Sequence, residues 1–242
     1  MATSEICADL LPTESIHDLV RAGRERLYPG ISNPNWLILR NRGRIFRRWF
    51  HALRLQDAKV LDIGGRIQPY RELIPFKNTY WSIDVRQTAL VNVLGNAERL
   101  PFAADSLDVV ICTQMIEYVT DPAALATEIH RVLRPGGSLF LSAPSIFPRD
   151  SEQDRWRFFP VALRQLFSQF SEVEVLPECG SAAGFLRTLA VMCHFSARYN
   201  AVRFALSYSL FPVINLLAAL AETIFGCRDG SFTVNYSVRA IK

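Results

Sequence analysis

The sequence predicts an α/β fold in which a doubly wound, mostly parallel sheet carries helices on both faces. Short apolar runs alternate with helical segments along the chain, and strands separated by helices imply a parallel sheet with right-handed crossovers. The first run, 58–63, contains Asp62 near its end, and Gly64 and Gly65 follow it directly. The next run ends in Asp84, 22 residues after Asp62. A glycine turn followed by an acid at the tip of the next strand is typical of sheets that bind a ribose-containing ligand.

The expected elements follow one another in a regular order. Strands are expected near 58–63, 79–84, 90–94, 107–113 and 137–143, with helical segments near 69–75 and 121–133. The helix at 121–133 begins well, because Asp121 can cap it and Pro122 suits the first helical position. A helix over 160–170, a strand over 172–176 and an alternating strand over 231–241 complete the series.

Residues 1–56 are predicted to form an N-terminal helical cap on a main domain over 57–242. A short helix is expected from 15 to 27 and a longer one from 34 to 55, where Phe46, Trp49, Phe50 and Leu53 recur at helical spacing. The other face of the longer helix is expected to carry arginines: Arg40, Arg42, Arg44, Arg47, Arg48 and Arg54. Such a basic amphipathic helix is either a membrane-surface element or a helix that packs on the main domain and closes over the ligand, with solvated arginines.

About fifty residues separate the last two predicted strands, far more than a hairpin needs. Within this insertion, 182–226, the stretch 204–221 carries no charge over 18 residues, which just reaches the length of a membrane span. A span conflicts with Pro212 and Asn215 in its middle and with a final strand that must return to the sheet. The open interpretations are a substrate lid or partner surface, interfacial membrane docking, and a helical hairpin that dips into the membrane. Peripheral membrane contact would then involve 34–55 and 201–225.

Composition sets further bounds on the chain. Its 242 residues are half hydrophobic, which suits one domain with an insertion, and a net charge of +4 is too small to indicate nucleic-acid binding. The cysteines and histidines are scattered, so neither a metal site nor a disulfide framework is expected. The N-terminus lacks the basic start and apolar stretch of a secretory signal, so we expect a cytoplasmic protein, with the inner membrane face as a peripheral site.

Three further segments carry a family resemblance. They read Gly95-Asn-Ala-Glu-Arg-Leu-Pro-Phe102, Gln114-Met-Ile-Glu-Tyr-Val119 and Leu133-Arg-Pro-Gly-Gly137. Together with the Asp62 turn and Asp84, they resemble the class I S-adenosylmethionine-dependent methyltransferases, particularly the branch of the ubiquinone and menaquinone enzymes. The resemblance covers roughly 59–144. It implies a Rossmann-like seven-stranded sheet in which strand seven runs antiparallel between strands five and six.

The resemblance also implies a set of cofactor-binding residues for S-adenosylmethionine. Asp62 would anchor the turn and meet the cofactor's ammonium group, directly or through water. Gly64 and Gly65 would let the backbone approach its methionine moiety, and Asp84 would accept from the ribose hydroxyls. The remaining residues would flank the adenine and border the methyl group: Asn96, Ala97, Glu98, Gln114 and Met115. The family usually has glycines where this chain has Arg66 and Gln68.

The acceptor side is less well specified. Tyr118 stands where this branch often has a histidine, and the pKa of tyrosine, near 10, does not suit a general base. The segment after strand five resembles a signature of glycan-associated methyltransferases, which makes Asp154, Trp156 and Arg157 the candidate catalytic residues. Asp154 would act as base or orienter, Trp156 would stack on a sugar or ring, and Arg157 would hold an anionic group. Alternatively, Arg157 pairs with an acid and Trp156 fills core.

The sequence therefore favours a methyltransferase that acts on a small-molecule, saccharide or lipid-linked acceptor. Two alternatives remain at this stage. One is a nicotinamide-dependent oxidoreductase, which also has a strand, a glycine turn and an acid at the tip of the next strand. The Gly-x-Gly-x-x-Gly motif of dehydrogenases is missing, however. A non-catalytic cofactor-binding or scaffold module of the same fold is favoured by Arg66, Gln68 and Tyr118.

Overall fold

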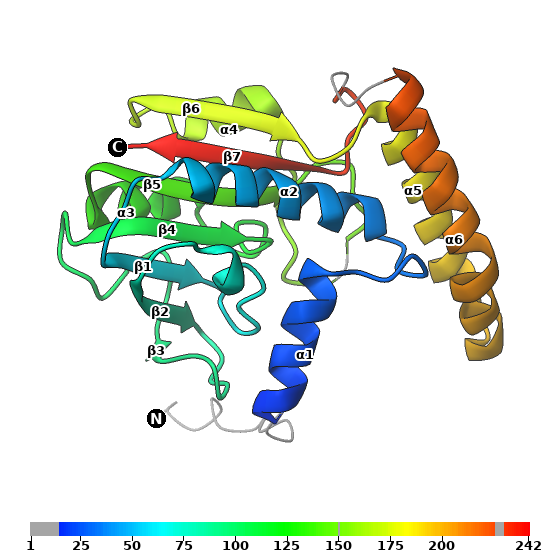
Figure 1. The fold of residues 1–242 in the computed structure, drawn as a ribbon, viewed down its shortest axis with the longest axis horizontal. Coiled ribbons are helices and arrows are strands. Elements are labelled where there is room, and N and C mark those ends of the chain that lie inside the picture. The colour runs from blue at the N-terminus through cyan, green and yellow to red at the C-terminus, as the bar shows by residue number, and fades with distance from the viewer. Residues whose placement is uncertain (1–14, 150, 226–229) are drawn as a thin grey trace, which may run out of the picture.

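A seven-stranded sheet forms the centre of the molecule in the computed structural model, which describes residues 15–149, 151–225 and 230–242 (Figure 1). Its strand order is β3-β2-β1-β4-β5-β7-β6. The strands are β1 (Ala58–Ile63), β2 (Asn78–Asp84), β3 (Val93–Leu94), β4 (Leu107–Thr113), β5 (Leu133–Pro144), β6 (Glu172–Pro177) and β7 (Asn235–Ile241). Strand β7 pairs antiparallel with both β5 and β6, while the pairs among β1–β5 are parallel. The predicted fold class is therefore confirmed.

Helices cover both faces of this sheet. On one face, α3 (Pro122–Val132) and α4 (Pro160–Leu166) contribute to the larger apolar core. On the other face lie α2 (Trp36–Ala52) and the short 3-10 helix η1 (Arg71–Leu73) (Figure 1). Phe46, Trp49 and Phe50 of the predicted apolar stripe are buried there, and Leu53, just after α2, is partly buried. Phe50 packs edge-on against Phe140 of β5 with ring centroids 4.8 Å apart. The preceding helix, α1, spans Ile16–Leu27 and is capped by Ser15.

One arginine of α2 departs from its predicted position. Arg42 was expected on a solvated face, but it is only 1% exposed. Its guanidinium donates to both carboxylate oxygens of Glu178 at 2.8 Å. Ser142 of β5 and Ser237 of β7 donate to the same carboxylate, each at 2.7 Å. The expectation was wrong for Arg42 because a buried acid beyond β6 provides the partner that a buried guanidinium needs.

Several elements are shorter than predicted: the helices expected at 34–55 and 160–170 and the strand expected at 231–241 lose residues at their ends. Two more elements are shortened for visible reasons. The helix expected at 69–75 is reduced to η1, because Pro75 holds the preceding residue, Ile74, in an extended conformation with ψ 112°. The strand expected at 90–94 pairs only over β3. There the side chain of Asn92 takes the place of a backbone partner: it accepts from the Ser82 backbone N–H at 2.7 Å and donates to the Tyr80 carbonyl at 3.3 Å.

The predicted helical insertion between β6 and β7 is a hairpin of two long helices. Helices α5 (Ser181–Ser196) and α6 (Asn200–Phe225) pack against each other at the side of the molecule to which the arrow of β1 points (Figure 1). The base of the hairpin is tied to the chain before α2, because the Asn215 side chain donates to the carbonyls of Ile31 and Asn33. Ala218 also packs with Leu37 and Ile38 in a small apolar cluster.

Candidate functional site

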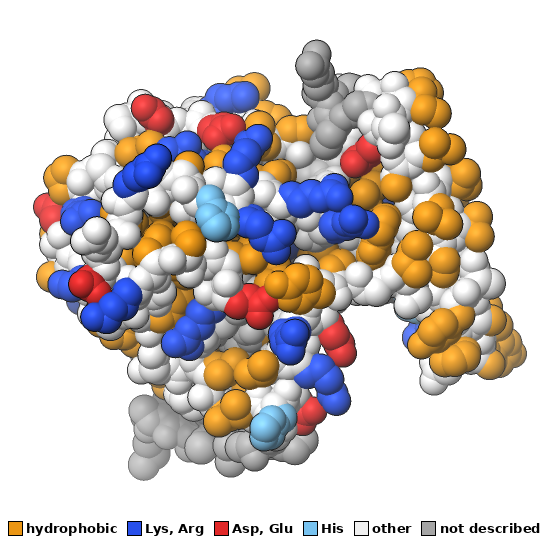
Figure 2. All heavy atoms as spheres, viewed as in Figure 1, with side chains coloured by type: hydrophobic (Ala, Val, Ile, Leu, Met, Phe, Trp, Pro, Cys, Tyr) orange, Lys and Arg blue, Asp and Glu red, His pale blue; other side chains and the backbone are white. Residues whose placement is uncertain are grey.

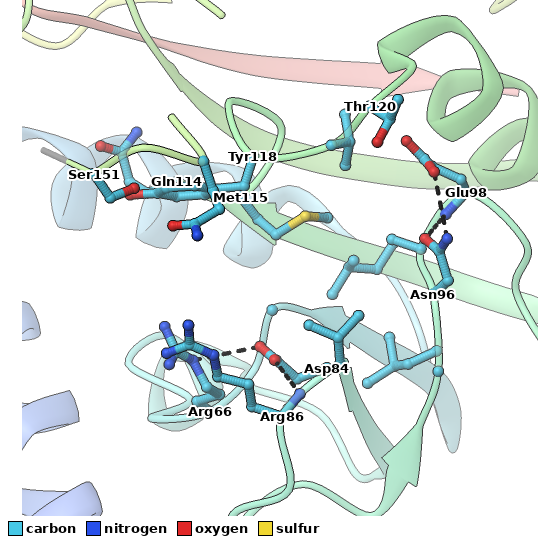
Figure 3. A pocket seen from close by; sticks show the side chains of 18 residues that line it. Arg66, Asp84, Arg86, Asn96, Glu98, Gln114, Met115, Tyr118, Thr120 and Ser151 are labelled. Atoms are coloured by element: carbon cyan, nitrogen blue, oxygen red, sulfur yellow. Dashed lines mark hydrogen bonds and ion pairs between the residues drawn. The ribbon is translucent and has the colours of Figure 1, made fainter. Parts of the chain in front are cut away.

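A cavity of about 520 Å³ lies at the carboxyl ends of β1, β2 and β4 (Figure 3). Parallel strands bring the residues after their ends to one edge of the sheet, which explains why distant sequence segments meet here. Seven of the nine predicted cofactor-binding residues line it: Gly64, Asp84, Asn96, Ala97, Glu98, Gln114 and Met115. Asp62 and Gly65 are not part of the lining.

The turn after β1 depends on its two glycines. Gly64 has a φ of +77°, a conformation that side chains rarely adopt, and a Cβ there would lie 2.9 Å from Cγ of Met115. A Cβ on Gly65 would lie 2.8 Å from Cβ of Ser82 and 2.9 Å from the Asp62 carboxylate. The Gly64 N–H donates to the Ile83 carbonyl at 2.8 Å, which ties the turn to β2. The glycines therefore let this turn pack tightly between Met115 and β2.

Asp62 lies beneath this turn and is only 3% exposed. Its carboxylate accepts a hydrogen bond from the Tyr80 hydroxyl at 2.7 Å. Burial raises the pKa of Asp62 to about 7; the Tyr80 hydrogen bond opposes this shift and the Asp84 charge adds to it. The structure therefore shows Asp62 in contact with the turn and with β2, and its contact with a ligand ammonium group, directly or through water, stays a prediction.

Asp84 ends β2 and faces the cavity (Figure 3). One carboxylate oxygen accepts from the Arg86 backbone N–H at 2.8 Å, and the other lies 3.4 Å from Nε of Arg66. A carboxylate has about four acceptor positions, so two neighbours leave capacity for hydroxyl donors. Asp84 therefore retains the capacity to receive a ribose, and Arg66 is close enough to compete for it.

The segment after β3 forms another side of the cavity. The Asn96 side chain accepts from the Glu98 backbone N–H at 2.9 Å, so it holds its own loop in shape. The Glu98 carboxylate accepts from the Asp121 backbone N–H at 2.7 Å and so joins this loop to the start of α3. Ala97 is buried and adds a small apolar surface that suits a flat ring.

The segment after β4 supplies the opposite side. Gln114 has a left-handed backbone with a φ of 51°, and its N–H donates to the Ser142 carbonyl at 2.9 Å. Its side-chain amide donates to the Ser142 hydroxyl at 3.2 Å. Met115 lies across from Gly64, and Tyr118 completes the lining where the resembling branch has histidine.

The three candidate catalytic residues do not line the cavity. Arg157 pairs with Asp154 and donates from Nε to the Phe147 carbonyl at 2.9 Å. The indole of Trp156 donates to the Val119 carbonyl at 2.9 Å, and its side chain is partly exposed. The alternative in which Arg157 pairs with an acid is thus the arrangement seen. The same segment reaches the cavity through two other residues, Ser151 and Gln153.

Sequence reasoning missed several lining residues: Arg66, Arg86, Thr120, Ser151 and Gln153. Arg66 carried a usable signal, because it occupies a usual glycine position immediately beyond the turn. The others lie in loops without a periodic pattern, so nothing in their spacing distinguishes them from solvated residues. Among the residues that the structure describes, no three His, Cys, Asp or Glu side chains gather to hold a metal.

The cavity fits S-adenosylmethionine by the chemistry of its lining. An acid stands at the tip of β2, a glycine turn packs close to a methionine side chain, and Ile83, Val85 and Ala97 offer apolar surface beside it. Among the described residues of the lining, Gly64 and Gln114 have a positive φ, and Gly64 is the glycine of the two. The approach of a ligand's methionine moiety would therefore depend on this one turn.

Comparisons with known proteins agree with this fit. Residues 70–141 match the family model described as a methyltransferase domain. A probable S-adenosylmethionine-dependent methyltransferase of Mycolicibacterium smegmatis is 28% identical over 137 residues, which cover 50% of each chain. The ubiquinone biosynthesis O-methyltransferase of Pseudomonas paraeruginosa is 37% identical over 68 residues, 28% of this chain and 27% of that protein. The chain thus matches half or less of the length of these relatives.

Solved structures support the same fold. Phosphoethanolamine N-methyltransferase 2 of Haemonchus contortus, solved with S-adenosyl-L-methionine, superposes with a TM-score of 0.52 at 15% identity. The match covers 96% of this chain and 60% of that one. At this identity the likeness concerns the fold, including the sheet edge where the cavity lies.

Proposed function

We propose that this chain is a class I S-adenosylmethionine-dependent methyltransferase that transfers a methyl group to a small-molecule, saccharide or lipid-linked acceptor. The observation that carries the proposal is Asp84, whose carboxylate faces the cavity from the tip of β2, beside the Gly64 turn, whose N–H bonds to the carbonyl of Ile83. The bound cofactor supplies an activated methyl group on a sulfonium. The chain's own residues must then hold the cofactor and acceptor in line, because orientation can supply roughly 7–11 kcal/mol of the barrier.

Each side of the cavity has a distinct part in this proposal. Asp84 accepts from the ribose hydroxyls, and Asn96 and Ala97 border the adenine. Gly64, Gln114 and Met115 surround the methionine moiety, while Asp62 and Gly65 fix the turn from below. Tyr118, at the same cavity, is placed to contact an acceptor, although its usual pKa argues against a role as general base.

The acceptor is proposed to enter beside the segment after β5. Ser151 and Gln153 line the cavity, and the Asp154–Arg157 pair holds their loop in shape by bonding to the carbonyl of Phe147. Trp156 offers a partly exposed ring for stacking. The hairpin of α5 and α6 lies at the same side of the molecule as the carboxyl ends of the parallel strands, which favours a lipid-linked acceptor (Figure 1).

The test is methyl transfer from labelled cofactor to separated acceptor fractions. Purified protein is incubated with methyl-labelled S-adenosylmethionine and either a lipid extract or a water-soluble saccharide and metabolite extract. Label in the organic phase supports a lipid-linked acceptor, and label in the aqueous phase supports a saccharide or small molecule. Cofactor binding by calorimetry without label in any fraction would contradict the proposed transfer for these classes.

Variants of the segment after β5 test whether this segment serves the acceptor rather than the cofactor. Trp156→Ala removes a stacking surface, and Arg157→Ala removes the partner of Asp154, yet neither residue lines the cofactor cavity. We expect cofactor affinity to stay nearly unchanged in both while methyl transfer falls. Loss of cofactor binding in both folded variants would instead place this segment in the cofactor site or the core.

A second candidate function is cofactor binding without catalysis. It is favoured by the contact between Arg66 and Asp84, because this arginine occupies a usual glycine position and lies 3.4 Å from the ribose acid. A non-catalytic module would bind S-adenosylmethionine and never release its demethylated product. Release of the demethylated product by the wild type separates the two functions. Arg66→Gly tests the contact itself: a gain in cofactor affinity shows that the arginine competes for Asp84.

A further inference from the structure

The outer surface of the α5–α6 hairpin is apolar, and no other part of the residues that the structure describes covers it. Among the described residues, α6 is the one helix that is long and apolar enough to cross a membrane, and only 22% of its most apolar window is buried. A core helix of similar composition would be mostly buried. In Figure 2, hydrophobic side chains gather over the hairpin where it leaves the main body. Burial of this surface therefore takes a partner beyond the residues that the structure describes.

The exposed apolar side chains follow helical spacing on both helices. On α6, Val213, Leu216 and Leu220 recur at i, i+3 and i+7 on the outward side, while Phe211 and Ala218 face inward and are buried. On α5, three exposed side chains recur at i, i+4 and i+7: Phe185, Leu189 and Met192. Large apolar side chains gain free energy when they leave water, so covering this surface is favourable.

The tip of the hairpin combines aromatic and basic side chains. Tyr199, Phe204 and Tyr208 are exposed, and the rings of Phe204 and Tyr208 lie 4.7 Å apart. The guanidinium of Arg198 lies 5.8 Å from the Tyr199 ring. Aromatic rings with basic neighbours are characteristic of side chains at the boundary between lipid and water.

Helix α2 adds positive charge on the face of the molecule shown in Figure 2, beside the hairpin. Arg40, Arg44 and Arg47 are exposed, and α2 contains no acidic residue. Arg42 does not contribute to this surface, because it is buried against Glu178. Basic side chains beside an apolar surface complement a bilayer that carries anionic headgroups.

We propose that the α5–α6 hairpin and the exposed arginines of α2 dock this protein onto the surface of an anionic lipid bilayer. A second copy of the chain fits less well. A partner helix would cover only one side of α6, whereas the exposed Phe204 and Val213 are nine residues apart and therefore point to opposite sides of it. A spanning arrangement conflicts with β7, which returns between β5 and β6. The docking is independent of methyl transfer, and its test uses vesicle binding alone.

The experiment is flotation of the full chain with vesicles in a density gradient. One set contains phosphatidylglycerol and the other only phosphatidylcholine. The protein should float with the anionic vesicles, and added salt should weaken this binding because it screens exposed charges. Binding to neither set overturns the proposal. Equal binding to both sets overturns the assignment of the arginines.

Paired variants locate the surface. Arg44→Gln with Arg47→Gln should weaken binding to anionic vesicles roughly 25-fold, since each basic residue is worth about fivefold (about 1 kcal/mol). Leu216→Gln with Leu220→Gln should abolish flotation. The matched control is Arg164→Gln with Val161→Gln on α4, where both side chains are exposed on the opposite face of the sheet. A control that loses as much binding as the test variants overturns the proposed surface.

Light scattering measures the oligomeric state of the protein without vesicles and so tests whether a second copy of the chain covers this surface instead. One result would assign the exposed apolar side chains of α6 to a second copy of the chain. In that case the wild-type protein does not float and forms a dimer, and the double variant Leu216→Gln with Leu220→Gln is a monomer. Thermal unfolding of every variant checks that its fold is intact. These side chains are exposed, so the melting temperatures should change little.

Discussion

Asp84 is held by two groups that act differently on its carboxylate. The Arg86 backbone N–H fixes one oxygen at 2.8 Å and orients the group, whereas the partly exposed Arg66 side chain approaches the other at 3.4 Å. An ion pair with an exposed partner is worth little, about 0–1 kcal/mol. A ligand hydroxyl can therefore displace Arg66 at small cost while the backbone contact stays in place.

Loss of this carboxylate should weaken cofactor binding. Asp84→Ala removes charge-assisted hydrogen bonds worth about 1.5–3 kcal/mol each, so the Kd for S-adenosylmethionine should rise more than roughly tenfold in calorimetry. Glu172→Ala serves as the control. Glu172 is an exposed residue at the start of β6, so its loss should leave the Kd unchanged. An unchanged Kd in folded Asp84→Ala protein would remove Asp84 from the ribose site.

Asp62 should make stability depend on pH in an unusual direction. Its pKa rises on folding from 3.8 to about 7, because burial penalises the charged form. Between these values the folded state holds a proton that the unfolded state has lost, so stability falls as pH rises through this window and then levels off. Asp62→Asn removes this dependence. The melting temperature of the variant relative to the wild type should rise from about pH 4 to pH 7.

The comparison tolerates a constant offset between the two proteins, since the amide alters the hydrogen bond from Tyr80. What matters is the slope of the difference with pH. If the melting temperatures of wild type and Asp62→Asn differed by the same amount at every pH in this range, Asp62 would be ionised at little cost in the folded protein.

Spacing identified Asp84 and Asp62 as strand-tip acids but could not say which of them faces a ligand. Successive residues of a strand point to opposite faces, and Ile63 is the residue of β1 that lines the cavity. Asp62 must therefore point the other way, toward Tyr80 and β2. The pattern of the sequence contains this alternation, but the face that holds the cavity is known only once the loops are placed.

At the scale of elements, the buried pair of Arg42 and Glu178 joins α2 to the end of β6. Burial lowers the pKa of Arg42, but the facing carboxylate more than offsets this and the net shift is upward. The same carboxylate accepts from Ser142, which also accepts from Gln114 at the cavity. The pair thus connects the helix layer to the sheet edge where the site lies.

Breaking this pair from one side should be costly. Arg42→Met leaves the Glu178 charge buried, and removing one partner of such a pair costs about 3–5 kcal/mol. Arg42→Met with Glu178→Leu should cost less than the sum of the single variants, as measured by denaturant unfolding in a double-mutant cycle. Arg21→Ala is the control, because its pair with Asp18 is exposed and should be worth less than about 1 kcal/mol. Additive effects at 42 and 178 would contradict the coupling.

The strands and helices could be predicted because the spacing of apolar residues is regular and clear start and stop residues bound the elements. Asp121 and Pro122 at the start of α3 are an example. The prediction failed where a distant side chain decided the outcome. No local pattern indicates that Glu178 lies opposite Arg42, since 136 residues separate them. Nor does local sequence indicate that Asn92 replaces a strand partner along β2.

At the scale of the whole molecule, the topology could be predicted and the environment of the insertion could not. The final strand had to return to the sheet, which fixed 182–226 as an excursion between β6 and β7. Hydropathy alone cannot distinguish a helix that turns its apolar side chains inward from one that exposes them. In this molecule Phe211 is buried and Leu216 is 58% exposed on the same helix.

Ligand binding should stabilise the whole fold, because the cavity is built from segments that follow β1, β2, β3 and β4. A ligand at 100 times its Kd adds about 2.7 kcal/mol to the free energy of unfolding. For a chain of this size that corresponds to a rise in melting temperature of roughly 5–10 °C. S-adenosylmethionine and S-adenosylhomocysteine should both produce it, and Asp84→Ala should reduce it. NAD should produce no rise, since the glycine pattern of dehydrogenases is missing; an equal rise with NAD would instead favour an oxidoreductase.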